Sequence, residues 1–108
     1  MLTATFSGPS IPDANVIVVV FAMKGCEHCE EYVPRFQKIA AAYKAKFPVL
    51  ILDAATKDAE TQRFATQIGV GPVPVTAVLR RGPGIYKVVG SVTDAEIRQI
   101  LDLASRFA

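Results

Sequence analysis

The chain has 108 residues, which suits one domain, and 51% of them are hydrophobic, enough for a sizeable core and too many for a disordered chain. Its 12 lysine and arginine residues are scattered among 10 acidic ones, and the resulting net charge of +2 argues against a nucleic-acid partner. The longest apolar run, residues 16–23, is far shorter than the about 18 residues that cross a bilayer, so no membrane partner is expected.

The first half of the chain predicts a strand, a helix and a second strand. Residues 16–22 form a β-branched run without polar alternation, typical of a central strand covered on both faces. Residues 26–46 carry one apolar stripe at spacings of three and four, which predicts a helix that Pro34 should kink. Residues 47–52 predict a second buried strand. The stripe consists of Tyr32 or Val33, Phe36, Ile39, Tyr43 and Phe47.

The second half predicts a short helix, a hairpin and a last helix. Residues 58–68 should be helical and stop at Gly69. Strands over 75–79 and 85–89, joined by a turn, fit a hairpin. Residues 93–96 form a capping box that opens the last helix. The expected inward residues are Phe64, Ala65 and Ile68 in the short helix and Ile97, Ile100, Leu101, Ala104 and Phe107 in the last one.

The order of these elements defines an architecture. A strand–helix–strand unit at the front requires a right-handed parallel crossover, and the hairpin at the back adds antiparallel strands. We therefore expect an α/β fold, a three-layer α/β/α sandwich whose mixed sheet has four to five strands, with residues 1–108 as a single domain. The fifth strand would be a short one near residues 2–6.

The two cysteines of the chain, Cys26 and Cys29, point to chemistry rather than to stability. A bridge between residues three positions apart closes almost no loop, so it would stabilise the fold only weakly. A structural zinc site usually needs four ligands, and this chain offers two cysteines and one histidine. We therefore expect neither a metal nor another cofactor.

The position of the pair suggests different roles for its members. Cys26 would stand at the start of a helix, where free amide groups and the helix dipole favour a thiolate over a thiol. Cys26 is then the nucleophile. Cys29, one turn further in and more shielded, would be the resolving thiol that breaks a mixed disulfide.

Four spacings carry a resemblance to a known family. The Cys-x-x-Cys pair opens the first long helix, and Pro34 follows Cys26 by eight residues. Val73 and Pro74 directly precede the third strand, and Gly90 follows Pro74 by sixteen residues. Over residues 16–108 the chain resembles the thioredoxin family.

The resemblance implies a thioredoxin fold and a thiol–disulfide oxidoreductase that acts on protein disulfides and dithiols. Pro74 would be cis and face the cysteines, and Val73 before it would offer backbone groups to an extended substrate. Gly90 would close the substrate groove. A reductase or glutathione would supply electrons, and the protein would be a monomer. An exposed apolar rim around the cysteines would instead suit a module that grips a partner in a larger assembly. It would consist of Met23, Gly25, Val70, Gly71 and Pro72.

Two departures from the family pattern bear on activity. Thioredoxins bury an aspartate where this chain has Val20, so a general base beneath Cys29 is missing and reduction of substrates should be slow. His28 resembles the histidine of Dsb-type oxidants, where it stabilises the thiolate and makes the disulfide more oxidising. The carboxylates of Glu27, Glu30 and Glu31 act in the opposite sense. We therefore expect a redox potential between those of reducing thioredoxins and of the strongest oxidants.

A second class of function fits the same residues. Thioredoxin-like domains also serve as folded subunits of larger assemblies with an idle redox centre, and Val20 and Gly25 allow this. The start of the chain, residues 1–4, shows no basic region followed by an apolar stretch, so we expect a cytoplasmic protein without a secretory signal.

Overall fold

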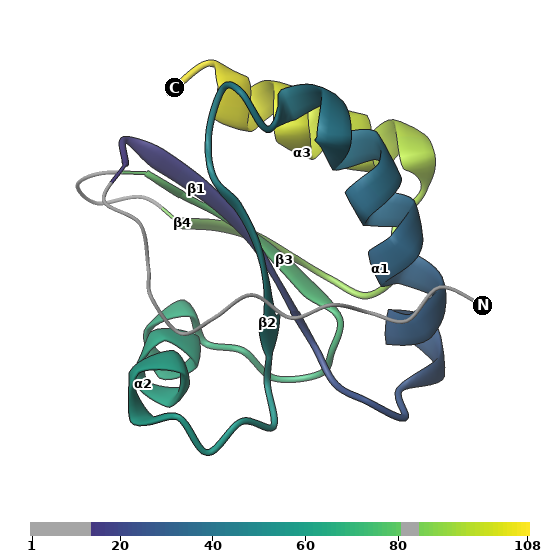
Figure 1. The fold of residues 1–108 in the computed structure, drawn as a ribbon, viewed down its shortest axis with the longest axis vertical. Coiled ribbons are helices and arrows are strands. Elements are labelled where there is room, and N and C mark those ends of the chain that lie inside the picture. Colours follow the sequence, from purple (N-terminus) through teal and green to yellow (C-terminus); the bar gives the residue numbers. More distant parts are fainter. Residues whose placement is uncertain (1–13, 81–84) are drawn as a thin grey trace.

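A four-stranded mixed sheet forms the middle layer of the protein (Figure 1). The structure is a computed structural model that describes residues 14–80 and 85–108; the expected strand near residues 2–6 and the turn at 81–84 lie outside them. The elements are β1 (Val16–Ala22), α1 (Glu27–Ala40), the 3₁₀ turn η1 (Ala41–Tyr43), β2 (Val49–Asp53), α2 (Ala59–Ile68), β3 (Val75–Arg80), β4 (Ile85–Val89) and α3 (Asp94–Ser105).

Strand β1 is the centre of the sheet, whose order is β2-β1-β3-β4. It pairs in parallel with β2 and antiparallel with β3, and β3 pairs antiparallel with β4. All seven residues of β1 are buried, because helices cover both faces of the sheet. The parallel crossover, the hairpin and the doubly covered central strand are confirmed.

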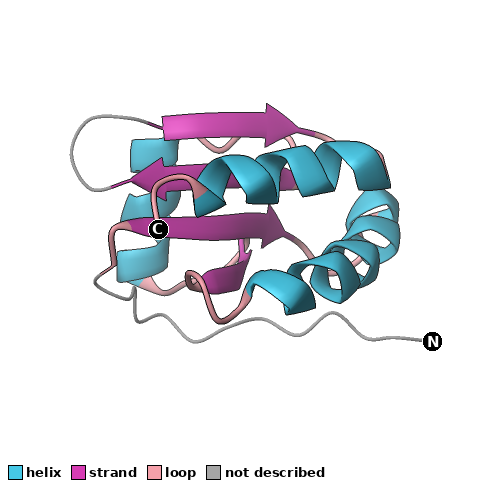
Figure 2. Cartoon of the chain, turned by 90° about the horizontal axis from the view of Figure 1, so that it is seen from above, coloured by secondary structure: helices cyan, strands magenta, loops and turns pink. Residues whose placement is uncertain are grey.

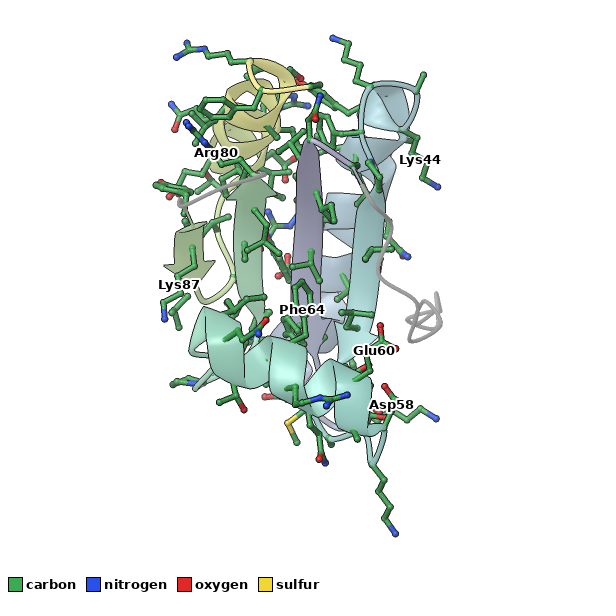
Figure 3. All side chains as sticks on the ribbon, turned by 90° about the vertical axis from the view of Figure 1, so that its left-hand side faces the viewer. Lys44, Asp58, Glu60, Phe64, Arg80 and Lys87 are labelled. Atoms are coloured by element: carbon green, nitrogen blue, oxygen red, sulfur yellow. The ribbon has the colours of Figure 1, made fainter. Side chains whose placement is uncertain are left out.

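Helices α1 and α3 cover one face of the sheet and α2 covers the other (Figures 1 and 2). The alternation of side chains along β1 divides its residues between two cores. Val18 and Val20 face α1 and α3, whereas Val19 and Phe21 face α2. Phe64 points from α2 toward the sheet (Figure 3), and its ring centroid lies 6.0 Å from that of Phe21.

The ends of the later helices follow their sequence signals. Gly69 closes α2 in the left-handed conformation, with φ of 79°. The Thr93 side chain accepts a hydrogen bond from the backbone of Glu96, and the Glu96 side chain accepts one in return, so the predicted capping box is confirmed.

The first helix is shorter than predicted. It ends at Ala40 and passes into η1, although the apolar stripe continues through Tyr43 to Phe47. Both side chains still pack against the core, and their ring centroids lie 6.1 Å apart. Burial therefore persists after the helical backbone has ended, which is why periodicity placed the end too late. Pro34 lies inside α1.

Phe107 corrects the predicted stripe of the last helix. Helix α3 ends at Ser105, so Phe107 lies beyond the helical period and is 37% exposed. The guanidinium of Arg80 lies 4.8 Å from the centroid of its ring. The other four stripe residues are buried. None of the helices within residues 14–80 and 85–108 is long and apolar enough to span a membrane.

Phe36 in α1 and Phe107 after α3 give a matched test of the core. Phe36 is fully buried between α1 and the sheet, so Phe36→Ala should lower the free energy of unfolding by about 3–5 kcal/mol. Phe107→Ala should lower it by less than about 1 kcal/mol, because much of that ring already contacts water. Urea unfolding followed by circular dichroism measures both. Equal losses would contradict the placement of the core.

Candidate functional site

A tight connection between β1 and α1 places Cys26 at the start of the helix. Strand β1 ends at Ala22, and Gly25 turns the chain with φ of 79°, a conformation that glycine adopts without strain. The backbone N–H of Cys26 donates to the carbonyl of Met23 over 3.4 Å. Cys26 itself has extended backbone angles and is the N-cap residue of α1.

The sulfur of Cys26 accepts a hydrogen bond from the first turn of α1. The backbone N–H of Cys29 donates to Cys26 Sγ over 3.2 Å. The sulfur thus takes the place of the oxygen of an ordinary N-cap side chain, and both this bond and the helix dipole favour negative charge on it. Both cysteines are free thiols; Cys26 is partly exposed, whereas Cys29 is 1% exposed.

Burial sets Cys29 apart from Cys26. Burial and the hydrogen bond with Cys26 together raise the pKa of the Cys29 thiol from 9.0 to about 11. Val20, which belongs to the same core cluster as Cys29, is fully buried. Within the two described segments no aspartate or glutamate side chain is buried, so no carboxylate in their core faces Cys29 as a base.

The loop before β3 contacts Cys26 across 47 residues of chain. The peptide bond between Val73 and Pro74 is cis. The thiol of Cys26 donates a long hydrogen bond to the Val73 carbonyl, with 3.9 Å between sulfur and oxygen. The residue before the cis bond therefore lies beside the exposed sulfur.

Gly90 joins this group from the end of β4. Its backbone N–H donates to the Pro74 carbonyl over 2.8 Å, which continues the β3–β4 pairing past Val75 and Val89. Its φ of 97° turns the chain away from the sheet toward α3. The structure thus links Cys26, Cys29, Val73, Pro74 and Gly90 through a chain of direct contacts.

The remaining residues named from the sequence are more loosely placed. His28 is exposed on the first turn of α1, and the described contacts include no hydrogen bond from its imidazole to either sulfur. Of the expected apolar rim, Met23 is 38% exposed, and Gly25, Gly71 and Pro72 are exposed. Val70 is instead half-buried against the core on the α2 side of the sheet, and its backbone N–H donates to the Ala65 carbonyl of α2 over 3.0 Å.

Charge around the site differs from the sequence interpretation in one respect. Glu27 and Glu30 are exposed beside Cys26, whereas the carboxylate of Glu31 is hydrogen-bonded to Arg35 and Ser91. Hydrogen bonds from Arg35 and from Ser91 lower the pKa of its carboxyl. Among the described residues there is no group of three histidine, cysteine or acidic side chains arranged to hold a metal.

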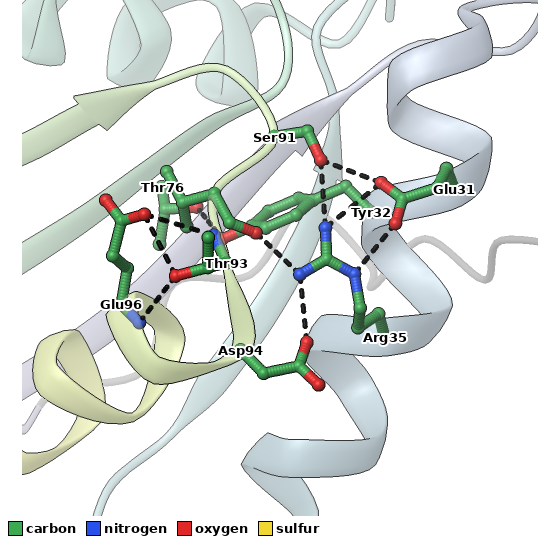
Figure 4. A network of polar contacts seen from close by, with 9 residues as sticks. Glu31, Tyr32, Arg35, Thr76, Ser91, Thr93, Asp94 and Glu96 are labelled. Carbon is green, nitrogen blue, oxygen red and sulfur yellow. Dashed lines mark hydrogen bonds and ion pairs between the residues drawn. The ribbon is translucent and has the colours of Figure 1, made fainter.

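Three features near the site were missed by sequence reasoning. The hydroxyl of Tyr32, predicted only as a core residue, bonds Thr76 Oγ1 over 2.7 Å inside the core. Lys87 Nζ donates to the carbonyls of Ile68 and Gly69, 3.2 and 2.9 Å away, and holds the end of α2. Arg35 binds a cluster of polar groups shown in Figure 4. Only the spacing of Glu31 and Arg35, four residues apart, signalled any of this in the sequence.

Known proteins similar in sequence belong to the family that the fold and the cysteine site suggest. The Thioredoxin family model matches residues 4–103, so the chain belongs to the thioredoxin family. The chain is 31% identical over 91 residues to protein disulfide-isomerase A4 of Bos taurus and 30% identical over 91 residues to that of Homo sapiens. Each match covers 81% of this chain but only 13% of the relative, so the chain spans about an eighth of their length.

Solved structures show the same fold. The J-Trx1 fragment of ERdj5 superposes with a TM-score of 0.69 at 17% identity, over 85% of this chain and 44% of that one. The oxidised thioredoxin from Plasmodium falciparum gives a TM-score of 0.63 at 17% identity, over 84% of this chain and 82% of that one. The predicted thioredoxin fold is confirmed.

The buried thiol of Cys29 predicts a pH effect on stability. Its pKa is raised in the folded state, so its contribution is present at neutral pH and is lost as pH rises from about 9 toward 11, where the unfolded chain ionises first. Between pH 7.5 and pH 10 the reduced protein should lose about 1 kcal/mol more unfolding free energy than Cys29→Ala does.

Urea unfolding under a reducing agent at the two pH values measures this difference. Cys29→Ala is the matched control, since it keeps Cys26 and every tyrosine and lysine that titrates in the same range. Equal pH dependence of the two proteins would contradict the assigned burial of the thiol.

Proposed function

We propose that the protein is a thiol–disulfide oxidoreductase acting on protein disulfides and dithiols, with Cys26 as nucleophile and Cys29 as resolving thiol. One observation carries the proposal. The partly exposed sulfur of Cys26 accepts the Cys29 N–H at a helix start and lies beside the Val73 carbonyl. A cysteine pair with only a structural role would need neither this exposure nor this capping position.

The first step is attack by Cys26. Its thiolate attacks one sulfur of a substrate disulfide, the substrate S–S bond breaks, and one substrate sulfur leaves as a thiolate that takes up a proton. A mixed disulfide then joins Cys26 to the substrate. The Cys29 N–H, 3.2 Å from Cys26 Sγ, stabilises the attacking charge.

The second step is resolution by Cys29. Its thiol loses a proton and attacks Cys26 Sγ, the second substrate thiolate leaves, and Cys26 and Cys29 become a disulfide. Two electrons have then passed to the substrate, and a reductase or glutathione restores the dithiol. Because Cys29 is buried with a raised pKa and Val20 offers no base, this step should limit the rate.

Substrate recognition would use backbone around Cys26. Val73 lies beside the sulfur, and Gly90 is joined to Pro74, so an extended polypeptide could lie along these residues as an added strand. We call Cys26, Val73 and Gly90, together with the buried Pro74 that joins Val73 to Gly90, the docking surface. The exposed side chain of Met23 would add apolar contact. No bound cofactor is needed for any step.

The relatives support the same class of reaction. Those matched at 30–31% identity are named protein disulfide-isomerase A4, although the chain spans a small part of each. The alternative is a folded module of a larger assembly with an idle redox centre. It is favoured by the missing acid at Val20 and by the exposed Met23.

Serine variants of the two cysteines test the proposal. With dithiothreitol as reductant, the wild-type protein should accelerate the reduction and precipitation of insulin, and Cys26→Ser should abolish this. Cys29→Ser should instead accumulate a mixed disulfide with a peptide disulfide, visible by mass spectrometry, because Cys26 can attack but cannot be released. An inactive wild-type protein, or activity that survives Cys26→Ser, would leave only the module interpretation.

The redox potential tests the role of His28. The imidazole lies on the first turn of α1, where its positive form would stabilise a thiolate at Cys26 and so the reduced state. We expect a potential between about −270 and −120 mV, the values of thioredoxin and of a strong oxidant. His28→Gln should lower it by about 10–30 mV, measured against glutathione; Glu60→Gln, on α2, is the control. No change in His28→Gln would exclude this role.

A further inference from the structure

One arginine connects the helix that carries the cysteines to the segment that follows Gly90. Arg35 Nε and Nη2 donate to the two carboxylate oxygens of Glu31, 2.8 and 3.1 Å away. Nη2 also donates to Ser91 Oγ over 2.9 Å, and Nη1 donates to the Val92 carbonyl and, over 2.9 Å, to Asp94 Oδ1. Figure 4 shows the guanidinium enclosed by these groups.

Two further contacts, one from Ser91 and one from Tyr32, complete the cluster around Arg35. Ser91 Oγ donates to Glu31 Oε2 over 2.7 Å, so Glu31, Arg35 and Ser91 form a triangle of hydrogen bonds. The guanidinium also lies 5.5 Å from the centroid of the Tyr32 ring, whose hydroxyl is bonded to Thr76 of β3. The arginine therefore contacts α1 and the 91–94 segment, and through Tyr32 it is linked to the sheet.

The segment that Arg35 holds forms one side of the docking surface. At the start of this segment Gly90 is held by its hydrogen bond to Pro74. At the end of the segment Thr93 is held by the capping box of α3. Arg35 binds the three residues Ser91, Val92 and Asp94 in and beside this interval. Arg35 thus connects α1, which begins directly after Cys26, to the segment that begins directly after Gly90.

We infer that Arg35 is a positioning residue for substrate binding: its contacts with Glu31 and Ser91 hold Gly90 at the distance from Cys26 that an extended polypeptide requires. The inference rests on the proposed function and adds to it the residue that sets affinity for polypeptides. It concerns binding alone, because Arg35 contacts neither sulfur in the described structure.

The effect should be geometric rather than a matter of overall stability. The side chains of Arg35, Glu31 and Asp94 are 26%, 55% and 50% exposed, and exposed ion pairs stabilise a fold only slightly. The planar guanidinium, by contrast, binds several acceptors in fixed directions, which a flexible lysine cannot reproduce.

Arg35→Met tests the inference by comparing a large and a small substrate. With insulin as substrate, the KM of the variant should be about ten times that of the wild type, and kcat should be nearly unchanged. This is expected because the segment after Gly90 must then be ordered each time a substrate binds, which weakens binding. With the small disulfide of hydroxyethyl disulfide, which has no polypeptide to dock, the rate should stay at the wild-type value. Arg35→Lys should recover only part of the insulin KM.

Two further variants keep the result interpretable. Ser91→Ala removes the hydroxyl that bonds both Arg35 and Glu31 from an exposed position, so it should fold and raise the insulin KM in the same direction. Arg98→Met removes an exposed arginine from α3 and should leave both substrates unaffected.

Hydrogen exchange at the amide of Gly90 separates this inference from the proposed function. Arg35→Met should exchange this amide at least about tenfold faster, because the segment behind it is released. Unchanged exchange, or a KM for insulin equal to that of the wild type, would overturn the inference while leaving the oxidoreductase intact. A wild-type protein that reduces neither substrate would instead refute the proposed function.

Discussion

The hydrogen bond from the Cys29 N–H to Cys26 Sγ is the contact on which the site depends. It exists because α1 begins at the residue after Cys26, and α1 begins there because β1 ends at Ala22 and Gly25 turns the chain. The first sulfur is thereby held in an N-cap position that favours negative charge, while the second enters the core one turn later. One helix start produces the difference in exposure between the cysteines and, in the proposed reaction, the difference in their roles.

Local sequence patterns were sufficient for most of the fold. The buried run of β1, the capping box before α3 and the glycine that ends α2 each depend on residues within one element, so sequence could locate them. The same patterns failed at Tyr43 and Phe107, where apolar residues continue beyond the end of a helix. An apolar residue reports that its side chain has a place to pack, and this remains possible after the backbone has left the helix.

Long-range contacts limited prediction of the site. The cysteine pair was visible as a motif, but the approach of Val73 to Cys26 spans 47 residues and was available only through the family resemblance. Arg35 was not singled out at all, because its partners Ser91, Val92 and Asp94 are 56 to 59 residues away. The pairing of Tyr32 with Thr76 was hidden for the same reason, since each looks like an ordinary core position by itself.

Val20 stands where thioredoxins bury an aspartate, and this difference affects Cys29. In the register of the sheet Val20 lies opposite Thr76, whose hydroxyl is already bonded to Tyr32. The polar groups opposite Val20 in the sheet are therefore a neutral pair that is hydrogen-bonded to itself, not a carboxylate. Such a pair spares the core the cost of a buried charge, yet it provides no base for the thiol of Cys29. In the proposed reaction this arrangement leaves Cys29 to attack the mixed disulfide without a buried base, and that step is therefore the slow one.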